Sequence, residues 1–220
     1  MKIVCVIPAW NEAKKIAAVI AAVQPLVDAV VVVDDTSPDD TSTVAAAAGA
    51  VVLRHPINRG QGAALRTGTR WALDQGADII IHFDGDGQFL ASDLPGLIEP
   101  LLQGAADIVF GSRFLRPNDQ LPWLKRYLIM PAAHLTNRLF YHKSLSDPQS
   151  GLRAMTAAAA VRLDWQEDRM AHCTEILGLA CKLKLKIKEV PMTVVYKNFG
   201  QKFSEGFVII GDLFINKISN

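Results

Sequence analysis

The sequence lacks any apolar run long enough to cross a bilayer, which takes about 18 or more consecutive apolar residues. Gln24 and Pro25 break the first candidate run, and Asp212 breaks the last. The first residues enter a strand pattern at once, without the charged and long apolar regions of a signal peptide. We therefore expect neither a membrane span nor export, and we expect a cytoplasmic protein.

Cysteine is scarce and the net charge is close to zero. Cys5, Cys173 and Cys181 are an odd number without CxxC spacing, which argues against a disulfide framework or structural zinc and indicates reduced thiols in the core. Lys and Arg total 23 against 22 acidic residues, so no overall basic field favours nucleic acid. Half of the residues are apolar, which is enough for a substantial core. The sequence predicts a globular protein whose partner is not a nucleic acid.

Continuous runs of β-branched residues alternate with helical patterns through the first half of the chain. Residues 2–7 and 30–33 are apolar without alternation, as in parallel strands that are buried on both faces. Further strands are predicted at 51–53, 78–83 and 107–110, and helices at 11–27, 41–49, 62–75 and 94–102. This order predicts an α/β fold with an open, mostly parallel, Rossmann-like sheet and helices on both faces.

The second half of the chain follows a different pattern. Residues 123–141 mix apolar and basic residues and predict one or two amphipathic helices, whose basic side faces either solvent or anionic lipid. Residues 207–215 are apolar on most sides and either pack on the core or lie on a membrane surface. Residues 182–188 alternate lysine with Leu or Ile and predict an edge strand protected by lysines.

Polar segments follow four of the predicted strands, at residues 7–12, 34–39, 55–62 and 84–88. In an open α/β sheet the carboxyl ends of the strands share one crevice, where ligands bind. The segment Asp84-Gly85-Asp86-Gly87-Gln88 offers two carboxylates and an amide oxygen, which suit Mg²⁺ or Mn²⁺ carrying a diphosphate. Alternating Asp and Gly also suits an ordinary turn. From this segment alone, both interpretations stay open.

Six segments stand in order along the chain: Pro8-Ala9-Trp10-Asn11-Glu12, Val33-Asp34-Asp35-Thr36-Ser37, Asn58-Arg59-Gly60-Gln61-Gly62-Ala63-Ala64-Leu65, Asp84-Gly85-Asp86-Gly87-Gln88, Gly111-Ser112-Arg113-Phe114 and Asp147-Pro148-Gln149-Ser150-Gly151. This ordered series resembles the inverting glycosyltransferase family 2, and most closely its polyprenyl-phosphate (dolichyl-phosphate) mannose or glucose synthases. The resemblance runs from residue 3 to about residue 200, and it implies a GT-A fold, a nucleotide-diphosphate sugar donor and a divalent cation, Mg²⁺ or Mn²⁺. It also implies a single domain over residues 1–220, with a nucleotide-sugar half at 1–112 and an acceptor half at 113–220.

The resemblance assigns roles to individual positions. It implies that Asp86 and Gln88 are metal ligands, and that Arg113 grips a phosphate of the acceptor or donor. Near the end of the chain, Lys197 and Lys202 stand in a stretch that departs from the Arg-x-x-Gly-x-Ser-Lys pattern of the branch, so the phosphate clamp there is altered. The residues implied to hold the nucleotide sugar are Pro8, Trp10, Glu12, Asp35, Asp84, Gly85 and Asp86. By itself, the pair Asp34-Asp35 is also typical of a helix cap and turn.

The acceptor decides whether the chemistry needs a general base. A polyprenyl phosphate is already anionic and attacks directly, whereas a sugar hydroxyl needs a carboxylate within hydrogen-bond reach. Asp147 and Glu175 are the candidates for that base, although Asp147 also suits a turn before Pro148 and Glu175 a helix surface. Gly60 and Gly62 are expected to let the start of a helix approach the donor closely.

These observations together predict a metal-dependent transferase. We expect it to move a hexose from a GDP-mannose- or UDP-glucose-type donor to a polyprenyl phosphate, peripherally at the inner face of the membrane. Transfer to a sugar hydroxyl of a cell-surface glycan remains an alternative, as does a nucleotide-sugar-binding module without turnover.

Overall fold

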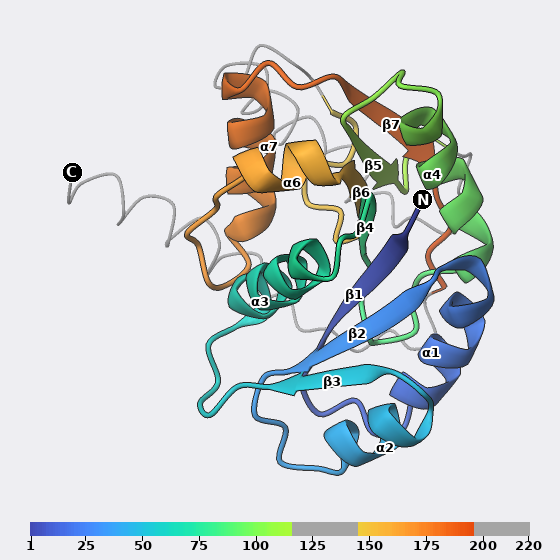
Figure 1. Ribbon diagram of the computed structural model, residues 1–220, viewed down its shortest axis with the longest axis vertical. Coiled ribbons are helices and arrows are strands. Elements are labelled where there is room, and N and C mark those ends of the chain that lie inside the picture. The colour runs from blue at the N-terminus through green and yellow to red at the C-terminus, as the bar shows by residue number, and fades with distance from the viewer. Residues whose placement is uncertain (116–144, 196–220) are drawn as a thin grey trace, which may run out of the picture.

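The computed structural model describes residues 1–115 and 145–195, which fold around one sheet (Figure 1). Its strand order is β3-β2-β1-β4-β6-β5-β7. Every strand of the described part runs parallel to its neighbours except β6, which pairs antiparallel with β4 and β5. The strands are β1 (Ile3–Ala9), β2 (Ala29–Asp34), β3 (Val51–Arg54), β4 (Ile79–His82), β5 (Ile108–Ser112), β6 (Arg153–Thr156) and β7 (Ile187–Pro191). The predicted open, mostly parallel α/β sheet is confirmed.

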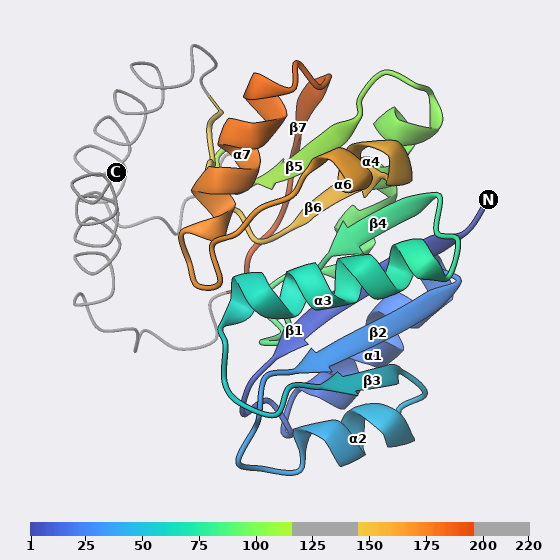
Figure 2. The same ribbon diagram turned by 60° about the vertical axis from the view of Figure 1, so that its left-hand side comes forward.

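Helices cover both faces of this sheet, as predicted. Figures 1 and 2 show α1, α2 and α4 on one face and α3, α6 and α7 on the other. The helices are α1 (Ile16–Val23), α2 (Thr41–Ala47), α3 (Gln61–Asp74), α4 (Leu94–Leu102), α6 (Ala157–Arg162) and α7 (His172–Lys182), with short 3₁₀ turns at η1 (Gln24–Leu26) and η2 (Ala91–Asp93).

The inner strand β1 contributes side chains to two core layers, one on each face of the sheet. Its side chains alternate, so that Cys5 and Ile7 pack with α1 and α4 while Val4 and Val6 pack with α3 and α7. All four side chains are fully buried. Burial on both faces explains why the strand has no polar positions, and each buried aliphatic side chain contributes about 1.5–3 kcal/mol.

Helix α3 approaches the sheet closely at Gly68. A Cβ added there would lie 2.2 Å from Val6 Cγ1 and 3.1 Å from Val33 Cγ2. Glycine therefore lets the backbone of α3 rest on β1 and β2, and this fixes where the first turn of α3 meets the ends of those strands.

Two features of the second half differ from the prediction. The lysine-alternating segment is not a strand throughout, because Lys182 ends α7 and Lys184 takes a left-handed conformation with φ 54° that closes the helix. The strand begins only at Ile187, although its edge position is confirmed. The short antiparallel strand β6 and the helix α6 that follows it were not predicted.

Several predictions fall outside the described residues. These are the basic amphipathic helices of 123–141, the apolar segment 207–215, and the phosphate-binding roles of Lys197 and Lys202. Among the helices of residues 1–115 and 145–195, none is both long and apolar enough to cross a membrane.

Candidate active site

The candidate site lies at the edge of the sheet where the parallel strands end. The antiparallel β6 starts at this edge, because Arg153 pairs with His82 at the end of β4 and with Phe110 in β5. The loops after β1, β2, β3, β4 and β5 and the segment that precedes β6 therefore share one edge. The structure thus brings together the strand-end loops in which the sequence predicted ligand-binding residues.

Asp84 follows the end of β4 at this edge of the sheet. Its Oδ1 accepts a hydrogen bond of 2.7 Å from Gln61 Nε2. A Cβ on Gly151 would lie 2.4 Å from Asp84 Oδ2, so the observed position of the Asp84 carboxylate requires glycine at residue 151. Burial raises the pKa of Asp84 to about 7, and the charges of Asp86 and Cys173 add to the effect.

Asp86 and Gln88 form the turn that follows. Asp86 Oδ1 accepts from the backbone N–H of Gln88 at 3.0 Å, and Gly87 takes φ 71°. The carbonyl of Gln88 accepts from the N–H of Val195 at 2.9 Å, which ties the turn to the chain after β7. The turn interpretation is thus correct for the backbone, and it leaves Asp86 Oδ2 without a hydrogen bond from the described residues.

The local charges fit a divalent cation. Burial raises the pKa of Glu12; its ion pair with Lys15 at 3.2 Å lowers it, and the neighbouring Asp86 raises it further. The negative charge of Asp86 thus raises the pKa of both Asp84 and Glu12, and a bound cation would reduce the repulsion among these carboxylates. Within the described residues no three His, Cys, Asp or Glu side chains cluster as a metal site. A Mg²⁺ or Mn²⁺ ion here would therefore need oxygens from a diphosphate or water to complete its shell.

Asp35, predicted to contact the nucleoside, organises the loop before α3. Its Oδ1 accepts from His55 Nδ1 at 2.7 Å and from the N–H of Arg59 at 2.9 Å, and its Oδ2 accepts from the N–H of Gly60 at 2.6 Å. The carboxylate is buried. Asp35 thus fixes the position of the loop that precedes α3.

The other residues predicted to hold the nucleotide follow β1. Pro8 pairs with Val33 inside the sheet, and its carbonyl oxygen lies against Gly85. Trp10 is 56% exposed, which is unusual for so large an aromatic side chain. Its ring is available to cover a flat ligand group such as a nucleobase.

Arg113 and Asp147 form a bidentate ion pair at the end of β5. Arg113 Nε and Nη2 each donate to a different oxygen of Asp147 at 2.7 Å, and the N–H of Arg113 also donates to Asp147 Oδ2 at 3.2 Å. Asp147 is buried, whereas the Arg113 side chain is 30% exposed. Asp147 therefore orients Arg113 and already accepts hydrogen bonds at both of its oxygens.

Glu175, the second predicted base, has a comparable arrangement. Its carboxylate accepts from the backbone N–H groups of Gln166 and Glu167 at 2.8–3.0 Å. It lies in the first turn of α7 and holds the loop between α6 and α7. Its oxygens are therefore used within the protein.

The structure changes the explanation for Gly60 and Gly62 at the start of α3. A Cβ on Gly60 would lie 2.5 Å from the carbonyl oxygen of Asp168, and one on Gly62 would lie 2.2 Å from that of Glu167. The close approach that requires glycine is thus made by the α6–α7 loop, which the prediction did not anticipate because it lies about a hundred residues away.

Two further site residues were missed. Gln61 stands inside a segment recognised in the sequence, but no pattern indicated that its amide would bind Asp84. Glu189 in β7 accepts from the N–H and Oγ of Ser146 at 2.8 and 2.9 Å and from the N–H of Asp147 at 3.2 Å. It thereby fixes the segment that carries Asp147, and nothing in the local sequence signals this role.

Comparison with known proteins identifies the same family that the sequence motifs resemble. Residues 4–167 match the family described as glycosyl transferase family 2. The UDP-N-acetylglucosamine–dolichyl-phosphate N-acetylglucosaminyltransferase of Methanococcus voltae is 33% identical over 178 residues, 76% of this chain and 70% of that protein. The undecaprenyl-phosphate mannosyltransferase of Micrococcus luteus is 32% identical over 170 residues, 75% of this chain and 68% of that protein.

A solved structure shares the fold. The crystal structure of glucosyl-3-phosphoglycerate synthase from Mycobacterium tuberculosis superposes with a TM-score of 0.71 at 25% identity, over 90% of this chain and 73% of that one. This likeness confirms the predicted GT-A fold.

Proposed function

Because the chain belongs to glycosyl transferase family 2 and is a glycosyltransferase, we propose that it moves a hexose from a nucleotide-diphosphate sugar to a polyprenyl phosphate. Two relatives support this choice of acceptor, since their names specify dolichyl phosphate and undecaprenyl phosphate. One of them also names a UDP-sugar as its donor.

The donor half of the proposal rests on the loops after β1, β2 and β4. Trp10 offers an exposed aromatic face for the base, and Asp35 holds the loop before α3 through the N–H of Arg59. Asp86 and Gln88 supply oxygen ligands for Mg²⁺ or Mn²⁺ next to the diphosphate position. When bound, such an ion neutralises the diphosphate and makes the nucleotide a better leaving group.

The choice of a phosphate as acceptor rests on one observation: the carboxylates of both predicted bases already accept hydrogen bonds within the protein. Asp147 is held by Arg113, and Glu175 by two backbone amides. A sugar hydroxyl would need one of these carboxylates to take its proton, whereas a phosphate oxygen attacks without a base. Asp147 then serves to orient Arg113, whose guanidinium favours a phosphate. Direct attack inverts the anomeric carbon and requires no protein nucleophile.

The test is a transfer assay with UDP- and GDP-sugars, Mn²⁺, and either a short polyprenyl phosphate or the matching polyprenol. We expect sugar transfer only to the phosphate, and loss of transfer when EDTA removes the cation. Asp147→Asn should retain a pH profile like that of the wild type, since no base titrates. Transfer to a glycan hydroxyl with a carboxylate-dependent pH profile would instead establish the alternative acceptor.

A further inference from the structure

The loop between α6 and α7 grips the first turn of α3 through backbone and side-chain contacts. The carbonyl of Asp168 accepts from the N–H of Ala63 at 3.1 Å, and Trp165 Nε1 donates to the carbonyl of Gly62 at 3.0 Å. The missing Cβ atoms of Gly60 and Gly62 make room for this crossing. The loop therefore occupies the place of an N-terminal cap for α3, whose own capping residue provides no side-chain cap.

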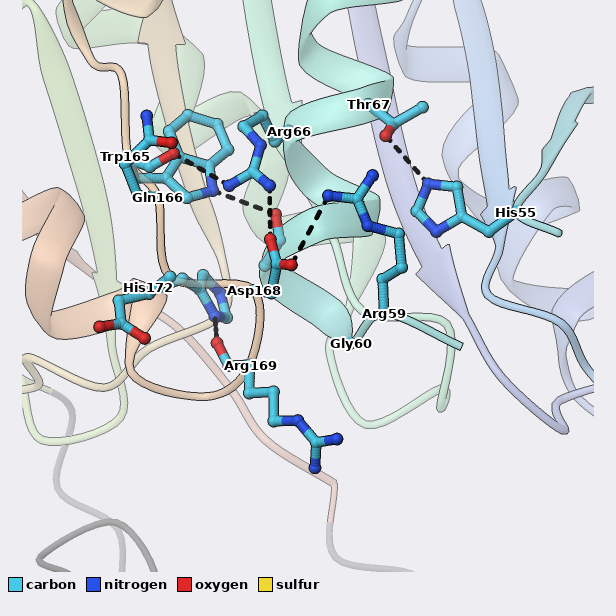
Figure 3. A network of polar contacts seen from close by, with 12 residues as sticks. His55, Arg59, Gly60, Arg66, Thr67, Trp165, Gln166, Asp168, Arg169 and His172 are labelled. Atoms are coloured by element: carbon cyan, nitrogen blue, oxygen red, sulfur yellow. Dashed lines mark hydrogen bonds and ion pairs between the residues drawn. The ribbon is translucent and has the colours of Figure 1, made fainter. Parts of the chain in front are cut away.

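Asp168 adds a charged link to the same turn. Figure 3 shows the guanidinium groups of Arg59 and Arg66 both directed at its carboxylate. Arg66 Nη2 bonds Asp168 Oδ1, and Arg59 Nη2 lies 3.6 Å from Asp168 Oδ2. Arg66 Nη1 also donates to the carbonyl of Trp165 at 3.0 Å. One carboxylate thus joins a residue before α3 to a residue inside it.

The turn held by Asp168 contacts two of the predicted donor-side carboxylates, Asp35 and Asp84. The N–H groups of Arg59 and Gly60 bind Asp35, and Gln61 Nε2 binds Asp84. A shift of this turn would therefore displace Asp35 and Asp84 together. The acceptor-side pair of Arg113 and Asp147 depends on Glu189 and shares none of these bonds.

We propose that Asp168 is a positioning residue for the nucleotide-sugar site, acting by holding Arg59 and Arg66 so that the start of α3 keeps Asp35 and Asp84 in place. The functional part of this inference rests on the proposed function. Because Asp168 is 40% exposed, its ion pairs are partly screened. We expect an effect on donor affinity of about 5- to 10-fold rather than a complete loss.

The first measurement is hydrogen exchange across residues 59–64 in the full chain. Asp168→Asn keeps the shape and the backbone carbonyl but removes the charge, so the amides of this turn should exchange faster than in the wild type. Asp164→Asn is the matched control, because Asp164 lies on the same loop with its side chain 71% exposed and 3.9 Å from Arg70. Equal exchange in Asp168→Asn and wild type would overturn the inference.

The second measurement is calorimetric binding of UDP and GDP with Mn²⁺, followed by transfer kinetics. Asp168→Asn should raise the Kd of the nucleotide and the KM of the donor about 5- to 10-fold, with the acceptor KM unchanged, and Asp168→Glu should recover part of the loss. A purely structural role would lower stability and kcat without raising the donor KM relative to the acceptor KM. Arg59→Gln, which changes an exposed partner, should raise the same two constants in the same direction.

The two measurements separate the possible failures. If wild-type protein bound no nucleoside diphosphate, the proposed function would fail, and hydrogen exchange would still decide whether Asp168 fixes the turn. Faster exchange with an unchanged nucleotide Kd would overturn the link from Asp168 to the donor site.

Discussion

At the scale of single residues, the site is built from carboxylates that are mostly bonded within the protein. Asp35, Asp147 and Glu175 each accept several N–H donors, and these bonds shape loops and orient Arg113. Asp84 and Asp86 differ, because among the described residues each accepts a hydrogen bond only at its Oδ1. The predicted metal ligand Asp86 is thus one of two carboxylates after β4 that keep an oxygen without a hydrogen bond from the described residues.

Replacing Asp86 tests the metal site. Asp86→Asn keeps an oxygen for the N–H of Gln88 but removes the negative charge, so the turn should persist while Mn²⁺-dependent nucleotide affinity falls by roughly 100-fold. Calorimetry of UDP and GDP binding with Mn²⁺ or EDTA measures this. Glu99→Gln on α4 is the control, and it should bind like the wild type. Wild-type affinity in Asp86→Asn with Mn²⁺ would remove Asp86 from the metal site.

His172 gives the stability a pH dependence of defined sign. Burial lowers its pKa from 6.5 to about 4, and the nearby Arg153 guanidinium, 3.2 Å away, lowers it further. The unfolded chain therefore binds more protons between these pH values, and stability is lost as the pH falls below 6.5. From pH 7 to pH 5 the loss due to His172 is about 2 kcal/mol.

Asp84 changes the pH dependence of stability in the opposite direction. The contribution of His172 is therefore measured by comparing the wild type with a variant that lacks this histidine. The pKa of Asp84 rises from 3.8 to about 7, and the folded state then holds the extra proton, which favours folding as the pH falls. Urea unfolding at pH 7 and pH 5 should show the wild type losing about 2 kcal/mol more than His172→Gln. Equal losses in the two proteins would contradict the assignment to His172.

At the scale of elements, α3 links the sheet to the site. Its middle rests on β1 and β2 through Gly68, and its first turn binds Asp35, Asp84 and the α6–α7 loop. The position of the helix is thus fixed at two points, and the element carries the geometry of the sheet into the donor loops.

Gly68→Ala should therefore destabilise the protein even though alanine favours helices. The added Cβ meets Val6 and Val33 in rigid central strands, and such overpacking costs about 1–3 kcal/mol. Gly96→Ala in α4 is the matched control, because nothing lies within 4 Å of its Cβ position, and it should gain up to about 1 kcal/mol. Thermal unfolding should show opposite shifts, and equal shifts would argue against the close contact.

Strand β7 supports the acceptor side through Glu189. Glu189→Gln leaves one acceptor oxygen for the donors of Ser146 and Asp147. Because hydrogen bonds to a charged group are lost, the free energy of unfolding should fall by about 1.5–3 kcal/mol. In transfer kinetics the acceptor KM should rise while the donor KM stays constant. Lys188→Gln, on the exposed side of the same strand, should change neither constant. A rise confined to the donor KM would place Glu189 elsewhere in the mechanism.

At the scale of the whole molecule, the residues proposed for donor and acceptor come from different parts of the chain but meet at one sheet edge. The loops after β1 to β4 supply the proposed donor side. Arg113 follows β5 and Asp147 precedes β6, and Glu189 of β7 supports this proposed acceptor side. The antiparallel β6 joins these parts by pairing with β4 and β5. Ligand binding should therefore stabilise the fold as one unit.

A thermal-shift panel of UDP- and GDP-sugars tests this. A nucleotide that binds only the folded state stabilises by about 2.7 kcal/mol at 100 times its Kd, which for a chain of this size raises Tm by roughly 5–10 °C. The shift should require Mn²⁺ or Mg²⁺ and should appear for one base only. Equal shifts with and without EDTA would show that binding does not depend on the cation.

Local patterns of a few residues were sufficient to predict the buried parallel strands, the helices between them, the Asp84 to Gln88 loop and the family. The contacts of Asp35, Asp147, Glu175 and the two glycines at the start of α3, in contrast, follow from the fold. Their partners lie elsewhere in the chain, up to about a hundred residues away, and a carboxylate that binds a backbone amide has the same sequence signature as one that awaits a substrate. Packing assigns those oxygens, and among the described residues it leaves Asp84 and Asp86 each with one oxygen that accepts no hydrogen bond.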